Sequence, residues 1–242
     1  MRLDGGPIRL AADGIPGPTR IRSGVKTALT LGVVILAVAS CRRPDPLLQP
    51  SPARLLRPAP DSFDVRVESS RGPFVLRARR HWSPAGVDRL YYLVAHRYFD
   101  EARFFRVVPG FVAQWGMSGS PAINRAWDEK NIPDEPVRAS NTRGRVAFAR
   151  GGPNTRSVQL FVNLADNVRL DTLDTFGFPP IAEVISGMAA VDSLNSEYLR
   201  TRIDGRPGPS QDSIQVAGNG YLARSFPQLD WIIRARISAD WQ

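Results

Sequence analysis

Arginine, phenylalanine and glutamine recur in an ordered pattern in the middle of the chain. Arg106 precedes a Pro109-Gly110 turn, Phe111 and Gln114 follow it, and Phe161 lies farther along. A guanidinium is a permanently charged, forked donor, a phenylalanine ring offers apolar surface, and a carboxamide can hold a peptide group. Each residue alone has an ordinary explanation as a core, turn or surface residue. Their order and spacing together favour a functional site.

These residues belong to a series of blocks that resembles the cyclophilins. The blocks are Phe104–Gly116, Gly144–Arg150, Gly152–Thr155, Gln159–Asn163, Ala165–Asp171, Gly187-Met188 and Val191-Asp192. The segment Ala165–Asp171 is most similar to the periplasmic bacterial members. The resemblance spans roughly residues 63–194, with a last strand near 232–237. It implies a peptidyl-prolyl cis/trans isomerase.

The resemblance also implies a role for each site residue. Catalysis falls to Arg106, Phe111 and Gln114, and substrate binding to Val112, Ala149, Arg150, Gln159, Phe161, Leu170 and Phe178. An Xaa-Pro bond rotates slowly because the nitrogen lone pair is delocalised into the carbonyl group. Arg106 would donate to that lone pair and stabilise the twisted state. The apolar residues would form the proline pocket, the glutamines would hold the peptide backbone or orient the arginine, and the backbone at 149–150 would line the groove.

Several positions depart from the family pattern. Arg169 stands where many members carry tryptophan, and we expect weaker sensitivity to cyclosporin from this change. Phe178 stands near the position of the pocket histidine, where periplasmic members also place an aromatic residue. Ser157-Val158 replaces Gly-Ser and Ile181-Ala182 replaces Phe-Gly, changes that favour altered packing or substrate access. The segment Tyr198–Leu229 is longer than a minimal member needs and is interpreted as a lid or docking surface.

Other chemistries fit the sequence poorly. His81 and His96 are the only histidines, and the single cysteine excludes a disulfide framework and a Cys-cluster metal site. We therefore expect no metal and no cofactor. The loop Gly151–Thr155 lacks the Lys-Ser/Thr of a phosphate cradle. The formal charge of +9 is scattered along the chain, so we expect no nucleic-acid partner.

Two alternative functions stay open beside the isomerase. The first is a cyclophilin-fold module that binds proline-containing segments as a chaperone or assembly factor without significant turnover. The changes at Val158, Arg169 and Ile181-Ala182 favour this module. The second is a purely structural envelope lipoprotein, which leaves the arginine and the glutamines without a role.

Alternation of apolar and polar residues predicts the strands that position the site. Strands are expected at 63–68, 73–79, 103–108, 111–114, 146–149, 159–164, 181–185, 213–217 and 231–237. One helix is expected to begin at Pro84 with Ser83 as its N-cap and an apolar face of Val87, Leu90, Tyr91 and Val94. A second is expected at 188–195. With the resemblance, the pattern predicts a mainly β fold, a closed antiparallel eight-stranded cyclophilin-like barrel capped by two helices.

The first forty residues have the layout of a targeting signal. Arg20, Arg22 and Lys26 precede an uncharged apolar run at 27–40 that is short for a membrane-spanning helix. Val38–Cys41 resembles the lipobox of bacterial lipoproteins, where cleavage precedes the cysteine and its thiol is then acylated. This predicts a signal peptide at 1–40, lipidation of Cys41 and attachment to a membrane through that lipid. The alternative is an uncleaved anchor with an incidental buried thiol.

Prolines crowd between Pro44 and Pro60. They predict a Pro-rich tether at 41–61, extended at about 3.1 Å per residue, in front of an isomerase domain at 62–242. We expect a monomer that is lipid-anchored at the cell envelope and faces the periplasm or the exterior. Its expected partners are unfolded or extended polypeptides that contain proline.

Overall fold

The computed structural model describes residues 44–198 and 208–241 of the chain. The predicted signal peptide at 1–40 and Cys41 lie outside these residues. In the part that is described, no helix combines the length and the apolar character needed to cross a membrane.

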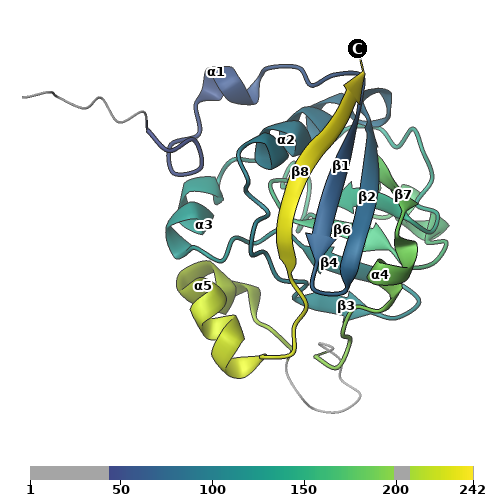
Figure 1. Ribbon diagram of the computed structural model, residues 1–242. Helices are drawn as coiled ribbons and strands as arrows, with labels where there is room; N and C mark the ends of the chain where they lie inside the picture. The colour runs from purple at the N-terminus through teal and green to yellow at the C-terminus, as the bar shows by residue number, and fades with distance from the viewer. Residues whose placement is uncertain (1–43, 199–207, 242) are drawn as a thin grey trace, which may run out of the picture. The chain divides into compact units, whose positions relative to one another are not determined.

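One antiparallel sheet of eight strands dominates the described residues (Figure 1). Its strands are β1 (Ser62–Ser69), β2 (Gly72–Arg79), β3 (Arg106–Val108), β4 (Val112–Trp115), β5 (Arg145–Phe148), β6 (Leu160–Asn163), β7 (Pro180–Ser186) and β8 (Ile232–Trp241). They are ordered β3-β4-β6-β5-β7-β2-β1-β8 across the sheet. Each lies within a few residues of a predicted strand, and the hairpin of β1 and β2 is confirmed.

The prediction of a closed barrel was wrong, because no strand ladder joins β3 to β8 at the two edges of this half-barrel. Among residues 44–198 and 208–241, the edges are joined through the segment before β3, where Arg103 and Trp231 form an isolated bridge. The Phe104 N–H donates to the Asp230 carbonyl oxygen at 2.9 Å. Glu101 has a φ of 63°, which takes the chain out of the extended conformation just before this contact. The extended run is therefore too short to continue the ladder.

The two predicted helices are present, but the described residues contain five. They are α1 (Pro52–Leu55), α2 (Pro84–Ala95), α3 (Pro121–Trp127), α4 (Met188–Asp192) and α5 (Gln211–Ser225), with 3₁₀ turns at Arg80–Trp82 and Val168–Asp171. The predicted apolar face of α2 is confirmed, since Val87, Leu90 and Val94 are buried. Tyr91 is half-buried, and its ring meets that of Phe63 edge-on at 5.0 Å.

Helix α2 is capped differently from the prediction. Ser83 occupies the N-cap position, but its side chain makes no capping hydrogen bond. The carboxylate of Glu135, more than forty residues away, accepts from the N–H groups of Ala85 at 2.9 Å and Gly86 at 3.2 Å. It also accepts from the Ser83 hydroxyl. An acidic side chain at this end of a helix satisfies free N–H groups and complements the helix dipole.

The strand predicted at 213–217 was wrong, because these residues lie in α5. Alternation of Ile214 and Val216 suggested a strand, yet only Ile214 is buried and Val216 is 72% exposed. The Ser210 hydroxyl accepts from the Ser213 N–H at 3.3 Å and caps the helix. The break in this helix at Gly218, with φ 53° and ψ −144°, limits its regular period.

The described part of the tether, residues 44–61, differs from the extended spacer that its prolines predicted. The Trp127 indole N–H donates to the Leu47 carbonyl oxygen at 2.9 Å, and the Tyr92 hydroxyl donates to that of Pro46 at 3.0 Å. The Ala59 N–H donates to Asp88 at 2.8 Å. Buried partners of this kind outweigh the preference of a Pro-rich segment for a solvated, extended chain.

Candidate active site

Arg106, Gln114 and Phe161 of the predicted site share one face of the sheet. The register pairs Arg106 on β3 with Gln114 on β4, and Gln114 with Phe161 on β6. The neighbouring row of Val107, Ala113 and Val162 points the opposite way and belongs to the main hydrophobic core. Because side chains alternate along each strand, anchoring the second row in the core directs the first row away from it.

A cavity of about 340 Å³ opens over this face. Its lining consists of Phe105, Arg106, Phe111, Val112, Gln114, Ala149, Arg150, Phe161, Leu170, Leu173, Phe178, Pro209 and Gln211. All the predicted site residues except Gln159 are among them. The apolar members include Val112, Phe161 and Leu170, which pack together with Ala147 in a cluster separate from the main core. The cavity therefore offers an apolar floor with two guanidinium groups and two carboxamides at its side.

The wall that contains Phe178 is held by short-range contacts. The ring of Phe178 meets that of Phe161 edge-on at 5.7 Å, and the Phe178 N–H donates to the Leu170 carbonyl oxygen at 2.8 Å. The Arg150 guanidinium lies 4.9 Å from the Phe178 ring and donates to the carbonyl oxygens of Leu173 and Gly177, both at 3.1 Å. The side chain of Arg150 thus fastens the pocket wall, a role that sequence analysis did not assign to it.

Arg106 is the cavity-lining residue to which the donor role was assigned. It is half-buried, and within the described residues it forms no ion pair with a carboxylate. Burial lowers the pKa of Arg106 from its ordinary value. Its Nη1 donates to Gln114 Oε1 at 3.5 Å, and the guanidinium lies 5.7 Å from the Phe111 ring. The remaining N–H groups are available to a ligand in the cavity.

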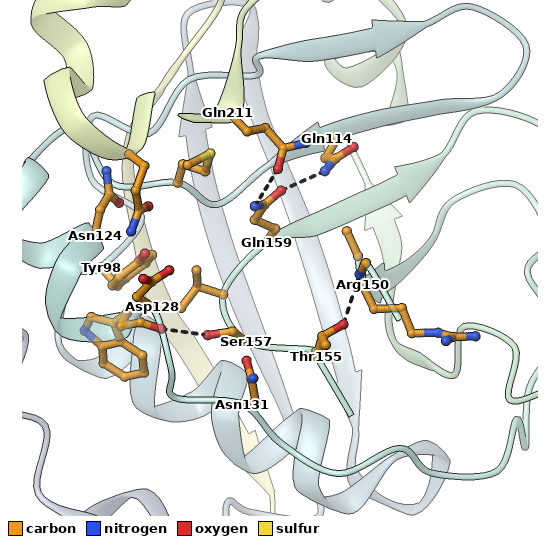
Figure 2. Close-up of a pocket in the computed structure, with 16 residues that line it drawn as sticks. Tyr98, Gln114, Asn124, Asp128, Asn131, Arg150, Thr155, Ser157, Gln159 and Gln211 are labelled. Carbon is orange, nitrogen blue, oxygen red and sulfur yellow. Dashed lines mark hydrogen bonds between the residues drawn. The ribbon is translucent and has the colours of Figure 1, made fainter. Parts of the chain in front are cut away.

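Gln159 lines a second cavity of about 400 Å³ beside the first. Gln114, Ala149, Arg150 and Gln211 line both. Figure 2 shows the side chains of Gln114 and Gln211 directed toward that of Gln159, each joined to it by a hydrogen bond. The Gln114 amide donates to Gln159 Oε1 at 2.8 Å, and the Gln159 amide donates to Gln211 Oε1 at 3.0 Å. Gln159 is therefore joined to the first cavity through Gln114.

Gly116 allows the backbone around Gln159 to lie close to the end of β4. Its φ is +111°, and a Cβ atom there would lie 2.4 Å from the Val158 carbonyl oxygen. We expect Gly116→Ala to destabilise the fold by more than about 1 kcal/mol, because both the conformation and the space exclude a side chain. Urea unfolding measures the loss. The control is Gly151→Ala, where a Cβ atom meets open space; equal stabilities of the two variants would contradict the prediction.

The described residues contain no group of three histidine, cysteine, aspartate or glutamate side chains placed to hold a metal ion. The polar groups at the cavity are instead two guanidinium groups, carboxamides and backbone. Such groups bind and polarise a peptide without forming a covalent intermediate.

This arrangement recurs in a known family. The family model of the cyclophilin type peptidyl-prolyl cis-trans isomerases matches residues 62–218, more than half of the chain. The chain belongs to this family. It is a cyclophilin-type peptidyl-prolyl cis-trans isomerase, as are several of its named relatives.

Bacterial proteins are among the curated relatives of this cyclophilin. Peptidyl-prolyl cis-trans isomerase B of Escherichia coli (strain K12) is 28% identical over 154 residues, which are 61% of this chain and 90% of the relative. Peptidyl-prolyl cis-trans isomerase A of Dickeya dadantii (strain 3937) is 30% identical over 141 residues, 57% of this chain and 73% of the relative. A solved cyclophilin type isomerase of Cryptosporidium parvum has a TM-score of 0.54 at 16% identity and covers 74% of this chain and 99% of that one. That structural likeness concerns the fold.

Sequence analysis missed four residues of the cyclophilin cavity, namely Phe105, Leu173, Pro209 and Gln211. Phe105 lies inside a block that was recognised, but no chemistry was assigned to it. Pro209 and Gln211 lie in the long segment 198–229, where the resemblance offers no guide. The Ser210 cap at the start of α5 was the local signal that could have placed Gln211 on a fixed element.

Proposed function

We propose that this cyclophilin catalyses rotation about Xaa-Pro bonds by using Arg106 as the donor to the prolyl nitrogen. The observation that carries the proposal is a half-buried guanidinium, free of any carboxylate among the described residues, beside an apolar cavity. In the planar peptide the nitrogen lone pair is delocalised and accepts poorly. As the bond twists, the lone pair localises on nitrogen and becomes an acceptor. A donor placed there stabilises the twisted state more than the planar ones.

The proline ring occupies the cavity floor in this proposal. Val112, Phe161 and Leu170 supply buried apolar surface, and the half-buried rings of Phe111 and Phe178 flank it. Gln114 and Gln159 hold the peptide or orient the arginine, and the backbone at 149–150 runs beside the groove. A further Cryptosporidium parvum structure of the same kind was solved in the presence of the dipeptide Ala-Pro. That likeness supports proline-containing peptides as the ligand class for this chain.

Contacts between a bound peptide and Phe161 test this placement. The full chain, kept soluble in detergent micelles, is mixed with a short Ala-Pro peptide. Intermolecular NOEs are expected between the proline ring protons and the Phe161 ring. NOEs that instead join the residue before proline to this ring would contradict the assignment of the cavity. A matched Ala-Ala peptide serves as the control and is expected to give none.

The proposal extends to the location of the enzyme. The signal-like segment 1–40 and the lipobox-like Val38–Cys41 support a lipid-anchored monomer at the cell envelope that serves exported, proline-containing polypeptides facing the periplasm or the exterior. On expression in a bacterial host, the mature protein is expected to begin at Cys41, carry acyl mass and fractionate with membranes. Cys41→Ala is expected to lose the acyl mass. An intact N-terminus without acyl mass in the parent would contradict this part of the proposal.

A further inference from the structure

Gln211 is the first residue of α5 and is fixed in place from two sides. The Ser210 hydroxyl caps the helix at the Ser213 N–H. The side-chain amide of Asn124, on α3, donates to the Ile214 carbonyl oxygen at 3.2 Å. On its apolar face α5 contributes Ile214 and Leu222 to a cluster with Phe105, Met117 and Leu229. A helix held by a cap, a hydrogen bond from α3 and an apolar cluster keeps its first residue at a defined position beside the cavity.

The carboxamides between Gln211 and Arg106 form a chain with a single direction. Gln211 Oε1 accepts from the Gln159 amide, Gln159 Oε1 accepts from the Gln114 amide, and Gln114 Oε1 accepts from Arg106. Each carboxamide has one oxygen end and one NH₂ end. A flip of one carboxamide would place two donors or two acceptors opposite each other. Because a guanidinium only donates, Arg106 requires the oxygen of Gln114, and the series of donors then ends at Gln211, whose oxygen is the last acceptor that this orientation of both other glutamines needs.

This orientation bears on Arg106 because the arginine has few other anchors. Among the described residues it has no carboxylate partner, and its contact with Gln114 is long, at 3.5 Å. A hydrogen bond of this length is weak. The position of the Arg106 guanidinium therefore depends more on the direction of the Gln114 oxygen than it would if a carboxylate held the arginine. With the NH₂ end of Gln114 toward the guanidinium, two donor groups would face each other.

We infer that Gln211 is a positioning residue for the isomerase, acting through Gln159 and Gln114 to keep the Gln114 oxygen directed at Arg106. The inference rests on the proposed function, in which Arg106 donates to the prolyl nitrogen. Gln211 itself does not touch the reacting bond in this account. Its contribution is the single acceptor oxygen at the end of the chain of carboxamides.

Three substitutions in the full chain, kept in detergent micelles, separate this role from a structural one. Gln211→Met keeps the length of the side chain but removes the acceptor oxygen. Gln211→Glu keeps an oxygen opposite the Gln159 amide. Gln215→Met makes the first change one turn later on the same helix, at a residue that lines only the second cavity. Steady-state kinetics on an Ala-Pro peptide and NMR of the Gln114 side-chain amide are measured for each.

Gln211→Met is expected to lower kcat about threefold to tenfold, as loss of one neutral hydrogen bond would, with little change in KM. It is also expected to shift the Gln114 amide resonances. Gln211→Glu is expected to restore both toward the parent, and Gln215→Met to leave both unchanged. A kcat and amide resonances in Gln211→Met that equal those of the parent would overturn the inference. So would equal losses in Gln211→Met and Gln215→Met, which would indicate damage to α5.

The proposed function fails on a different result. If Arg106→Ala retains the parent rate, the role of Arg106 is wrong, whatever the glutamine variants do. If Arg106→Ala is slow while Gln211→Met is as fast as the parent, the role of Arg106 stands and only the inference on Gln211 falls. If Gln211→Met folds poorly, the Gln211→Glu variant tests the acceptor role of Gln211 instead. Parent-like kcat and Gln114 amide resonances in Gln211→Glu support the acceptor role, and a lowered kcat with shifted resonances in this variant contradicts it.

Discussion

Arg106→Ala is expected to lower kcat/KM for an Xaa-Pro peptide about 100- to 1000-fold, the range seen when one donor to a transition state is removed. The physical reason is that the guanidinium acts on a lone pair that is an acceptor only in the twisted state. Initial rates of cis-to-trans conversion measure the effect. Arg106→Lys keeps the charge but loses the forked geometry, so an intermediate rate is expected.

The fold of Arg106→Ala should be at least as stable as that of the parent. Arg106 has no ion pair among the described residues, and burial already disfavours its charged form. Arg169→Ala is the matched control. Its guanidinium also lies near the Phe111 ring, at 4.9 Å, but it is exposed. We expect Arg169→Ala to catalyse isomerisation at a rate close to that of the parent. Equal losses of rate in the Arg106 and Arg169 variants would indicate that positive charge near the cavity affects catalysis in general.

Glu135→Ala is expected to cost about 3–5 kcal/mol in the free energy of unfolding, as does removal of one partner of a buried ion pair. Glu135 is paired with Arg156, whose side chain is 0% exposed, at 3.0 Å. The change would leave this guanidinium with Asp134, 3.8 Å away, as its remaining carboxylate. It would also free the N–H groups of Ala85 and Gly86 at the start of α2.

Urea unfolding of the parent and of Glu135→Ala measures this loss of stability. Glu68→Ala is the control, because Glu68 pairs with exposed Arg234 at the surface and such pairs contribute little. If the Glu135 and Glu68 variants lose equal stability, the buried network does not hold α2 in the way described.

The contribution of Glu135 also has a defined pH dependence. Burial raises its pKa, but the hydrogen bonds from Ser83, Ala85 and Arg156 outweigh burial, so the pKa lies below the ordinary value of 4.5. A carboxyl group whose pKa is lower in the folded state stabilises the fold above its unfolded pKa. The stability difference between parent and Glu135→Ala should therefore be full above about pH 4.5 and shrink as pH falls through the folded pKa. A constant difference down to pH 2 would contradict this assignment.

The local sequence pattern was sufficient to predict strands that have one face in the core. The alternation around Arg106, Gln114 and Phe161 predicted β3, β4 and β6 within a few residues, because side chains on a pleated strand alternate between its faces. The same alternation places these three residues on one face. The family resemblance supplied the order of the blocks and the reaction.

Hydrogen-bond partners that lie far apart in the chain could not be predicted from the sequence. Glu135 caps α2 from a distant loop, and the tether contacts Trp127 through Leu47, because tertiary hydrogen bonds leave no mark on local composition. The helix at 213–217 was mistaken for a strand because Ile214 and Val216 alternate over a stretch too short to distinguish the two periods. Gln211 was not predicted because its importance arises from a tertiary hydrogen bond, the one that the Gln159 amide donates to it.

Cis/trans exchange of a short Xaa-Pro peptide, followed by NMR, tests the central role of Arg106 most directly. The full chain in detergent micelles and its Arg106→Ala variant are compared at peptide concentrations where both bind. The account predicts strong acceleration of exchange by the parent and loss of nearly all of it in the variant. Binding by the parent with exchange at the uncatalysed rate would contradict the account and favour a module that binds proline-containing segments without turnover.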